Sequence, residues 1–331
     1  MGLSIGSLLG RSQAMERVRS FANRAARVNA PVLILGETGT GKSLLGKVIH
    51  QQSGRSPAPF LAINCAGIPD SLFESEFFGH QKGAFTGARE ARKGYLEQAH
   101  MGSLFLDEIG ELTVGQQAKL LTALEEGEVR RLGGEGTVRV DVRLLSATSR
   151  DLLEGMRGGS FRRELYHRLA VLVCHIPPLR ERPEDIPLLA RRFLRKLEDR
   201  HHRPPGTLSP DVIRYLREKP WHGNIRELAH LLEAALILAE GGTLGKDALQ
   251  TAEAMVGDVG AGGDHPSGGV AESPKPAARG HRYAFPGTEE EERDMILKAL
   301  ARARGNKSRA ARELGMARNT LRQRIQRYRL L

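Results

Sequence analysis

The chain has 331 residues, a hydrophobic share of 40% and a formal net charge of +11. This length predicts about two domains, since ~100–200 residues per domain is usual. No run of about 18 apolar residues occurs and the N-terminus lacks the segments of a signal peptide, which argues against a membrane span and against export. Cys65 and Cys174 lie far apart in apolar stretches, so they indicate packing residues of a cytoplasmic protein.

The positive charge is concentrated at the C-terminus. Residues 298–331 hold eleven Lys or Arg and one acidic residue, Glu313, whereas the rest of the chain is close to neutral. A basic cluster confined to one short helical segment indicates binding to nucleic acid.

The N-terminal part predicts an α/β domain over residues 1–176. Val32–Leu35 is a short apolar run that reads as a buried strand, and a helix is expected from Lys42 to about Gln52. Further strands are predicted at 60–63, 103–106, 144–147 and 170–176, with helices between them such as 114–126. This alternation predicts a parallel sheet with helices on both faces.

The pattern changes after Pro177-Pro178. Helices at about 184–202, 210–218 and 224–239 predict a small helical lid over 177–255. Residues 256–287 hold eight Gly and four Pro, a composition that predicts a flexible linker.

Residues 288–331 predict three short helices and a helix-turn-helix. An acidic start at 289–292 leads into the first helix, at 295–303, and the second and third helices are expected at 307–314 and 317–329. In the last helix the inward face is Leu321, Ile325 and Tyr328. The outward residues predicted to contact DNA are Arg318, Asn319, Thr320, Arg322 and Arg324.

The strand at 32–35 leads into a phosphate-binding pattern, Gly36-Glu37-Thr38-Gly39-Thr40-Gly41-Lys42-Ser43. Lys42 would reach the β- and γ-phosphates of ATP, and Ser43 would offer a hydroxyl to Mg²⁺. Asp107 and Glu108 end another predicted strand. Asp107 suits the Mg²⁺ shell and Glu108 suits the residue that orients the attacking water, so an ATPase is predicted.

Six small or apolar residues interrupt this ATPase core, Gly83-Ala84-Phe85-Thr86-Gly87-Ala88. The two glycines allow a tightly bent loop, and an exposed Phe85 makes sense as an anchor for another protein. A second insertion at about Glu128–Val138 is expected to support the first, with a plain hairpin as the alternative.

These motifs resemble one family, the sigma-54-dependent transcription activators, also called bacterial enhancer-binding proteins. Other matching segments are Leu8-Leu9-Gly10, Asn64-Cys65-Ala66, Glu74–His80, Phe161–Leu169, Pro177–Arg182 and Trp221–Leu228. The resemblance implies an AAA+ fold, a ring that is usually a hexamer, a Fis-type DNA-binding domain, and contact of residues 83–88 with the sigma factor.

The resemblance also implies roles for single residues. Asn64 is expected to sense the γ-phosphate through Glu108, Thr148 to be the first sensor and Arg226 the second. Arg162 and Arg168 are expected to be arginine fingers that reach the ATP of a neighbouring subunit. The chain departs from the family pattern at Ser43, Phe77, Gln81, Ser149, His222, Ala229 and His230. These departures leave the nucleotide chemistry intact and concern the coupling between ATP and the loop.

The sequence therefore predicts a cytoplasmic, ATP- and Mg²⁺-dependent activator. It is expected to bind upstream duplex DNA through residues 288–331 and to remodel the closed complex of the sigma-54 RNA polymerase holoenzyme. With no receiver domain expected before Leu8, as in activators of phage-shock and type III secretion genes, control would come from a partner protein, expression level or oligomerisation.

Two other classes of function stay open. One is an AAA+ remodeller of DNA such as a helicase loader, against which the apolar tip of the 83–88 loop argues. The other is a repressor-like DNA binder with an inactive ATPase, against which the intact Lys42, Asp107 and Glu108 argue.

Overall fold

The structure is a computed structural model of the chain. It describes residues 3–203, 206–239, 244–260 and 289–303, and the single positions 310, 314, 321, 325 and 328. Residues 1–264 and 265–331 are two separate compact units, and each has a core of its own.

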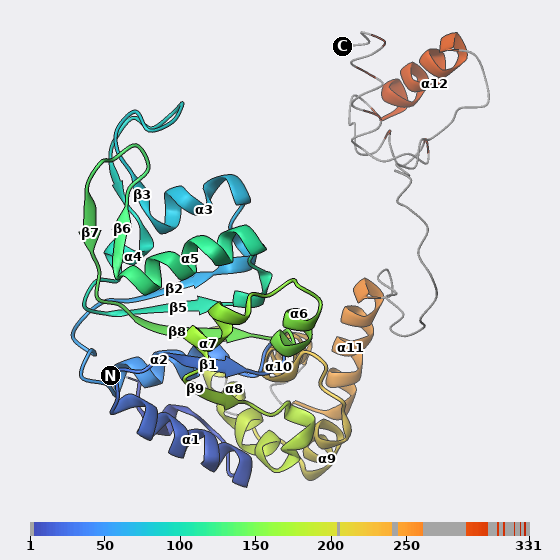
Figure 1. Cartoon of the computed structure of the whole chain (residues 1–331). Coiled ribbons are helices and arrows are strands. Elements are labelled where there is room, and N and C mark those ends of the chain that lie inside the picture. Colours follow the sequence, from blue (N-terminus) through green and yellow to red (C-terminus); the bar gives the residue numbers. More distant parts are fainter. Residues whose placement is uncertain are drawn as a thin grey trace. The chain divides into compact units, whose positions relative to one another are not determined.

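A parallel five-stranded sheet forms the centre of the first unit (Figure 1). Its strands lie in the order β2-β5-β8-β1-β9, with bounds β1 Val32–Leu35, β2 Phe60–Asn64, β5 Ser103–Asp107, β8 Arg143–Thr148 and β9 Leu172–His175. The predicted parallel sheet is confirmed. The predicted start of the last strand at residue 170 is wrong, because the backbone N–H of Ala170 still bonds to Tyr166 at the end of the preceding helix.

Helices cover both faces of the sheet, and β1 shows why. Val32 and Ile34 point into a core that is shared with α1 (Gln13–Ala26) and α2 (Lys42–Gln51). Leu33 points the opposite way, into a core shared with α3 (Asp70–Phe77), α5 (Val114–Glu126) and α7 (Arg163–Leu169). A short helix, α6 (Leu152–Arg157), adds Leu152 to this second core. Successive side chains of a strand alternate between faces, so a continuous apolar run fills both cores.

A helical lid follows the sheet and packs around the fully buried Trp221. Its helices are α8 (Ile186–His201), α9 (Pro210–Glu218), α10 (Asn224–Leu238) and α11 (Lys246–Gly260). The predicted helix from 184 begins as a 3₁₀ turn, Pro183–Asp185, before α8. Helix α11 continues to Gly260, five residues into the segment that the sequence predicts as linker, and residues 261–287 of that segment lie outside the described part.

Two antiparallel hairpins project beyond the sheet on the same side (Figure 1). The first pairs β3 (Gly79–His80) with β4 (Arg92–Lys93), which leads into the short helix α4 (Tyr95–Gln98), and the second pairs β6 (Glu128–Arg130) with β7 (Thr137–Arg139). The backbone of Leu132 accepts from Gln81 N and donates to Gly79 O, both at 2.9 Å. The second insertion is thus a hairpin, and it is also hydrogen-bonded to the first.

The second unit contains α12 (Glu289–Arg302) and a small apolar core. Leu321 and Ile325 are buried against Ile296 of α12, and Tyr328 packs at the edge. The inward face predicted for the last helix is confirmed at these positions. The five residues predicted to contact DNA, Arg318, Asn319, Thr320, Arg322 and Arg324, lie outside the described residues.

None of the helices described is long and apolar enough to cross a bilayer. Cys65 and Cys174 are both free and buried, and burial raises the pKa of their thiols to about 12 and about 11. Both are packing residues, as expected.

Gly46→Ala tests the packing of α2 on the sheet. A methyl group there would lie 2.5 Å from two ring carbons of Phe105. The helix-propensity gain of ~1 kcal/mol is offset by an overpacking cost of ~1–3 kcal/mol, so we expect a lower free energy of unfolding. Gly115→Ala in α5 is the control, since its methyl would meet nothing within 4 Å. Denaturant unfolding measures both, and a Gly46→Ala variant as stable as the Gly115→Ala variant would contradict the packing.

Candidate nucleotide-binding site

Three neighbouring strands end together and build the site. β5, β8 and β1 are adjacent in the sheet, and their carboxyl ends lie at one edge because all three are parallel. The phosphate loop, residues 36–43, follows β1, while Asp107 ends β5 and Thr148 ends β8. Leu35 is paired with Thr148, and the next backbone N–H, at Gly36, donates to Thr148 O at 3.3 Å. The sheet therefore brings the predicted groups to one edge.

The phosphate loop needs glycine at two positions for different reasons. Gly39 has φ +81°, and a Cβ there would collide with the carbonyl oxygen of Gly223 in the lid. Gly41 has φ +104° and precedes α2, and a Cβ there would meet nothing within 4 Å. The space in front of the α2 N-terminus is therefore open, and helix N-termini of this kind bind anions through free backbone N–H groups.

Lys42 is held at the mouth of this space with all three of its donors engaged. Its Nζ donates to Gly36 O at 2.8 Å and Glu37 O at 3.3 Å. It also forms an ion pair with Glu108 at 3.2 Å. The side chain is only 5% exposed, so its ammonium group is fixed rather than freely solvated.

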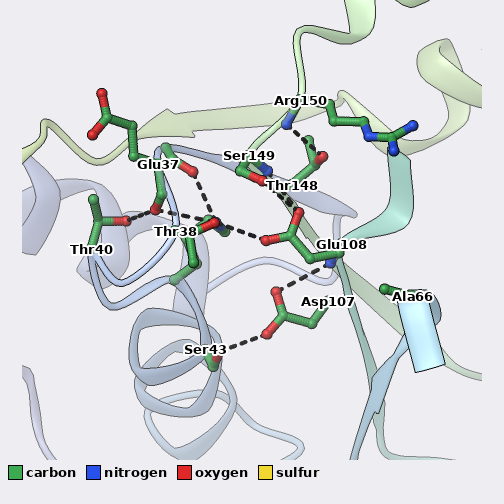
Figure 2. A network of polar contacts seen from close by, with 12 residues as sticks. Glu37, Thr38, Thr40, Ser43, Ala66, Asp107, Glu108, Thr148, Ser149 and Arg150 are labelled. Carbon is green, nitrogen blue, oxygen red and sulfur yellow. Dashed lines mark hydrogen bonds and ion pairs between the residues drawn. The ribbon is translucent and has the colours of Figure 1, made fainter. Parts of the chain in front are cut away.

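Glu108 is the strained residue of the site. Its φ and ψ of 51° and 50° are left-handed, a conformation that costs a non-glycine residue ~1–3 kcal/mol. One carboxylate oxygen accepts from the backbone N–H and the hydroxyl of Ser149, both at 2.9 Å (Figure 2). Burial alone would raise the pKa of Glu108, but these two bonds and Lys42 outweigh it, so the pKa lies below its ordinary value. The carboxylate stays ionised at neutral pH.

Ser43 and Asp107 fit a magnesium ion. The Ser43 hydroxyl donates to an Asp107 carboxylate oxygen at 2.8 Å (Figure 2), so two oxygen ligands of the type Mg²⁺ prefers already converge. Within the described ranges, no group of three or more His, Cys, Asp or Glu side chains could hold a metal. A site with one carboxylate and one hydroxyl suits Mg²⁺ that takes its other ligands from phosphates and water.

Two of the three residues expected to sense the nucleotide, Asn64 and Thr148, occupy strand ends beside these acids. Asn64 is paired with Asp107 across β2 and β5, but its side chain accepts from Ala66 N at 3.1 Å. In this state it caps a turn, and the Glu108 carboxylate contacts Lys42 and Ser149. Thr148 is buried, and its hydroxyl accepts from Arg150 N at 3.1 Å.

The three arginines expected at the γ-phosphate lie in two places. Arg226, on α10, lines a cavity of about 280 Å³ together with Lys42, Asp107 and Glu108. Arg162 and Arg168 lie at opposite ends of α7, exposed along α5. Arg162 donates to Val114 O at 3.2 Å and Arg168 to Leu124 O at 2.6 Å, and neither lines this cavity. The structure brings Arg226 to the phosphate loop of its own chain and leaves the other two at the surface.

The lid binds the phosphate loop from behind, a contact that the sequence did not predict. Three consecutive loop carbonyls accept hydrogen bonds from lid residues: Thr38 O from Asn224 Nδ2 (3.1 Å), Gly39 O from Ile225 N (3.0 Å) and Thr40 O from Arg182 Nη2 (3.3 Å). We call Asn224, Ile225 and Arg182 the lid clamp. Because the acceptors are main-chain carbonyls, the side chains of the loop give no pattern from which this contact could be predicted.

Glu37 extends the lid clamp at the surface. Its carboxylate accepts two bonds from Arg180, at 2.5 and 2.8 Å, and one from Asn224 at 3.0 Å. These bonds, those from Arg180 first, lower the pKa of Glu37 to about 2. Asn224 itself is fully buried at φ +53°, and its Oδ1 accepts from Leu179 N at 2.7 Å. One buried amide thus joins the phosphate loop to the first residues of the lid.

Comparison with known proteins assigns the chain that carries this site to a family. Residues 8–175 match the sigma-54 interaction domain, residues 180–255 an AAA+ ATPase lid domain, and residues 288–328 the Fis family of bacterial regulatory proteins. The chain belongs to the sigma-54 activator family.

Relatives match along nearly the whole chain. It is 44% identical over 319 residues to the Nif-specific regulatory protein of Azotobacter vinelandii, covering 96% of the chain and 58% of that protein. It is 41% identical over 314 residues to the transcriptional regulatory protein ZraR of Escherichia coli K12, covering 95% of the chain and 67% of ZraR. The chain thus spans less than two thirds of the length of the Nif regulator.

Solved structures support the AAA+ fold. NtrX from Brucella abortus in complex with ADP superposes with a TM-score of 0.69 at 31% identity, covering 96% of this chain and 68% of NtrX. The complex of NtrX with ATP gives the same score at 30% identity, covering 97% and 69%. Hsp104, at 17% identity and a TM-score of 0.52 over 70% of this chain and 45% of its own, shares the fold alone.

Asn224→Ala tests the lid clamp. It leaves the Leu179 N–H without its acceptor and the Thr38 carbonyl without its lid donor, which costs ~1–3 kcal/mol of unfolding free energy for such buried groups. We also expect a higher Kd for ATP, because the loop loses one of its supports.

Arg180→Ala is the matched control. It removes a half-exposed ion pair, which solvent screens so that it contributes little to stability, while the main-chain contacts remain. The contribution of the Glu37 carboxylate to the free energy of unfolding is present above its unfolded pKa of 4.5 and is lost as the pH falls toward about 2. The unfolding free energy and the Kd for ATP of the two variants are therefore compared at pH 6 to 8. Titration with a fluorescent ATP analogue measures Kd, and equal values for the two variants would argue against the clamp.

Proposed function

We propose that this protein is an ATP-hydrolysing transcription activator that binds upstream DNA and remodels the closed complex of sigma-54 RNA polymerase in the cytoplasm. The observation that carries the proposal is the convergence of a phosphate loop, two acids and a lid arginine at one sheet edge, in a domain that also projects the 83–88 loop. We divide the chain into the nucleotide-binding subdomain (1–176), the lid (177–255), a linker (256–287) and the DNA-binding domain (288–331).

The chemistry of ATP hydrolysis fits the residues at this edge. The N–H groups of the phosphate loop and Lys42 would bind the phosphates. Ser43 and Asp107 would hold Mg²⁺, which neutralises phosphate charge when bound. Glu108, ionised and oriented by Ser149, would accept a hydrogen bond from the attacking water and align it with the γ-phosphate.

The sensor and finger roles are those that the family resemblance implies, and the positions of the residues support them. Arg226 is the lid residue that would meet the γ-phosphate, and Thr148 ends the strand between the loop and Glu108. Asn64 would have to leave its hydrogen bond with Ala66 N before its amide could reach Glu108. Within the part of the chain that the structure describes, the exposed side chains of Arg162 and Arg168 bond to main-chain carbonyls. This suits exchange for the phosphates of a neighbouring subunit in a ring, for which we propose a hexamer.

The 83–88 loop is proposed to contact the sigma factor. Gly83 N donates to Ala88 O at 2.8 Å, which closes the loop at its base. Phe85 is 44% exposed and packs its ring edge-on against His80, with centroids 5.0 Å apart. An apolar side chain left exposed at such a projecting turn suits a protein partner. A regulatory protein acting in trans remains part of this proposal.

Glu108→Gln tests the role of the acid. The amide keeps the size of the carboxylate but accepts a proton poorly, so we expect ATP binding within about threefold of the parent and a fall in kcat of ~10²-fold or more. Glu111→Gln, whose carboxylate pairs with Arg150 and does not line the cavity, is the control and should turn over normally. Turnover of the Glu108→Gln variant close to that of the parent would remove Glu108 from the mechanism.

Thr86→Ala tests the loop and with it the proposed function. The loop lies apart from the phosphate site, so the ATPase rate should stay within about twofold of the parent. Open-complex formation by sigma-54 polymerase should fall by ~10-fold or more, which is equivalent to ~1.4 kcal/mol. Thr122→Ala, on α5, removes the same hydroxyl outside the loop and should activate normally. A Thr86→Ala variant that opens the promoter like the parent would refute the contact.

A further inference from the structure

Two connected grooves lie on the lid between α8 and α9. Their volumes are about 350 and 400 Å³, and they share Arg191 and Leu208 in their walls. Arg195 completes the first, and Arg214 and Arg217 complete the second, beside the half-buried Ile213. We call Arg191, Arg195, Arg214 and Arg217 the arginine groove. None of its residues lines the cavity at the phosphate loop, so it is separate from the nucleotide site.

The charges of the arginine groove are not balanced by acids. Among the residues that the structure describes, the one ion pair of these four arginines is Arg214 with Asp211, 3.6 Å apart and both highly exposed. Two other arginines of the lid are paired with acids at closer range, Arg180 with Glu37 and Arg200 with Glu233. Residues 186–218 carry eight Lys or Arg and four Asp or Glu. An anion would relieve this concentration of like charge.

The spacing of the arginines suits a row of phosphates. Arg191 and Arg195 are one turn apart on α8, which places their Cα atoms about 6 Å apart along the helix axis. Arg214 and Arg217, three apart on α9, also share one face. A guanidinium group binds phosphate oxygens with two parallel N–H groups, so each arginine can hold one phosphate. Two connected open grooves suit an extended polyanion better than one small ion.

We propose that the arginine groove binds the sugar–phosphate backbone of duplex DNA. The inference rests on the proposed function in one respect, that the chain binds DNA through residues 288–331. DNA held by one part of a chain is present at a raised effective concentration for a second site on the same chain. Contacts to phosphate and sugar carry no sequence information, so the groove adds affinity equally to specific and scrambled sites.

The test is the salt dependence of DNA binding by the full chain. Arg191→Ala/Arg195→Ala removes two groove charges, whereas Arg192→Ala/Lys196→Ala removes two exposed charges from the next positions of the same helix, which do not line the groove. The slope of log K against log salt concentration changes by ~0.9 for each phosphate contact. We therefore expect the slope to become shallower by about 1.8 in the groove variant and to stay near the parent value in the control.

The outcomes separate the groove from the function it rests on. Fluorescence anisotropy of labelled specific and scrambled DNA gives the slopes, with ATPase and Tm showing that both variants are folded. Equal slopes for the groove variant and its control would overturn the DNA groove. A parent chain that does not bind DNA would instead overturn the proposed function. Loss of pyrophosphate binding by the groove variant, with no change in the DNA slope, would assign the groove to free phosphate anions and overturn it for DNA.

Discussion

The hydrogen bonds between the lid and the back of the phosphate loop are the constraint on which the site depends. A loop with three glycines has many accessible conformations, and ordering each residue costs ~1–2 kcal/mol of conformational entropy. The N–H groups must face the phosphates, so the carbonyls need partners of their own. Asn224, Ile225 and Arg182 supply these partners to three consecutive carbonyls. The conformation of the loop and the position of the lid are therefore coupled. A ligand that favours one conformation of the loop also favours the lid position that is bonded to it.

The charged groups at the sheet edge are bonded to one another in a second network, formed by Lys42, Glu108 and Ser149. One of the three N–H groups of Lys42 contacts Oε1 of Glu108, and Oε2 of Glu108 accepts from Ser149. A bound phosphate would compete for Lys42, and Glu108 would then be held by Ser149 alone. Glu108 comes directly after β5, and its backbone there is left-handed. Its carboxylate lies beside the end of β8, where it is bonded to Ser149. Ser149, one of the departures from the family pattern, is thus the residue that orients the acid.

The sequence predicted those parts of the fold that depend on local patterns. Helix α5 has the predicted bounds because Thr113 caps its start and Gly127 ends it in the left-handed conformation. The C-terminal core around Leu321 and Ile325 followed from helical spacing. Helix α1 was missed, although Ser12 caps it and Met15, Val18, Ala22 and Ala25 lie buried along one face. The lid clamp depends on main-chain atoms of the phosphate loop that tertiary folding brings next to the lid, which no local pattern encodes.

A continuous set of contacts joins the nucleotide edge to the projecting loop. Ser149 follows β8, the strand that the β6–β7 hairpin enters. Leu132, within that hairpin, is bonded to Gly79 and Gln81 at the base of the 83–88 loop. Gly133 lies so close to Ala84 that a Cβ on it would approach the Ala84 side chain to 2.9 Å. A change in how Glu108 holds Ser149 would act on the end of β8, and the hairpin that leads into β8 already supports the loop. Because closely packed contacts resist small continuous deformation, we expect the hairpin and the base of the 83–88 loop to move together.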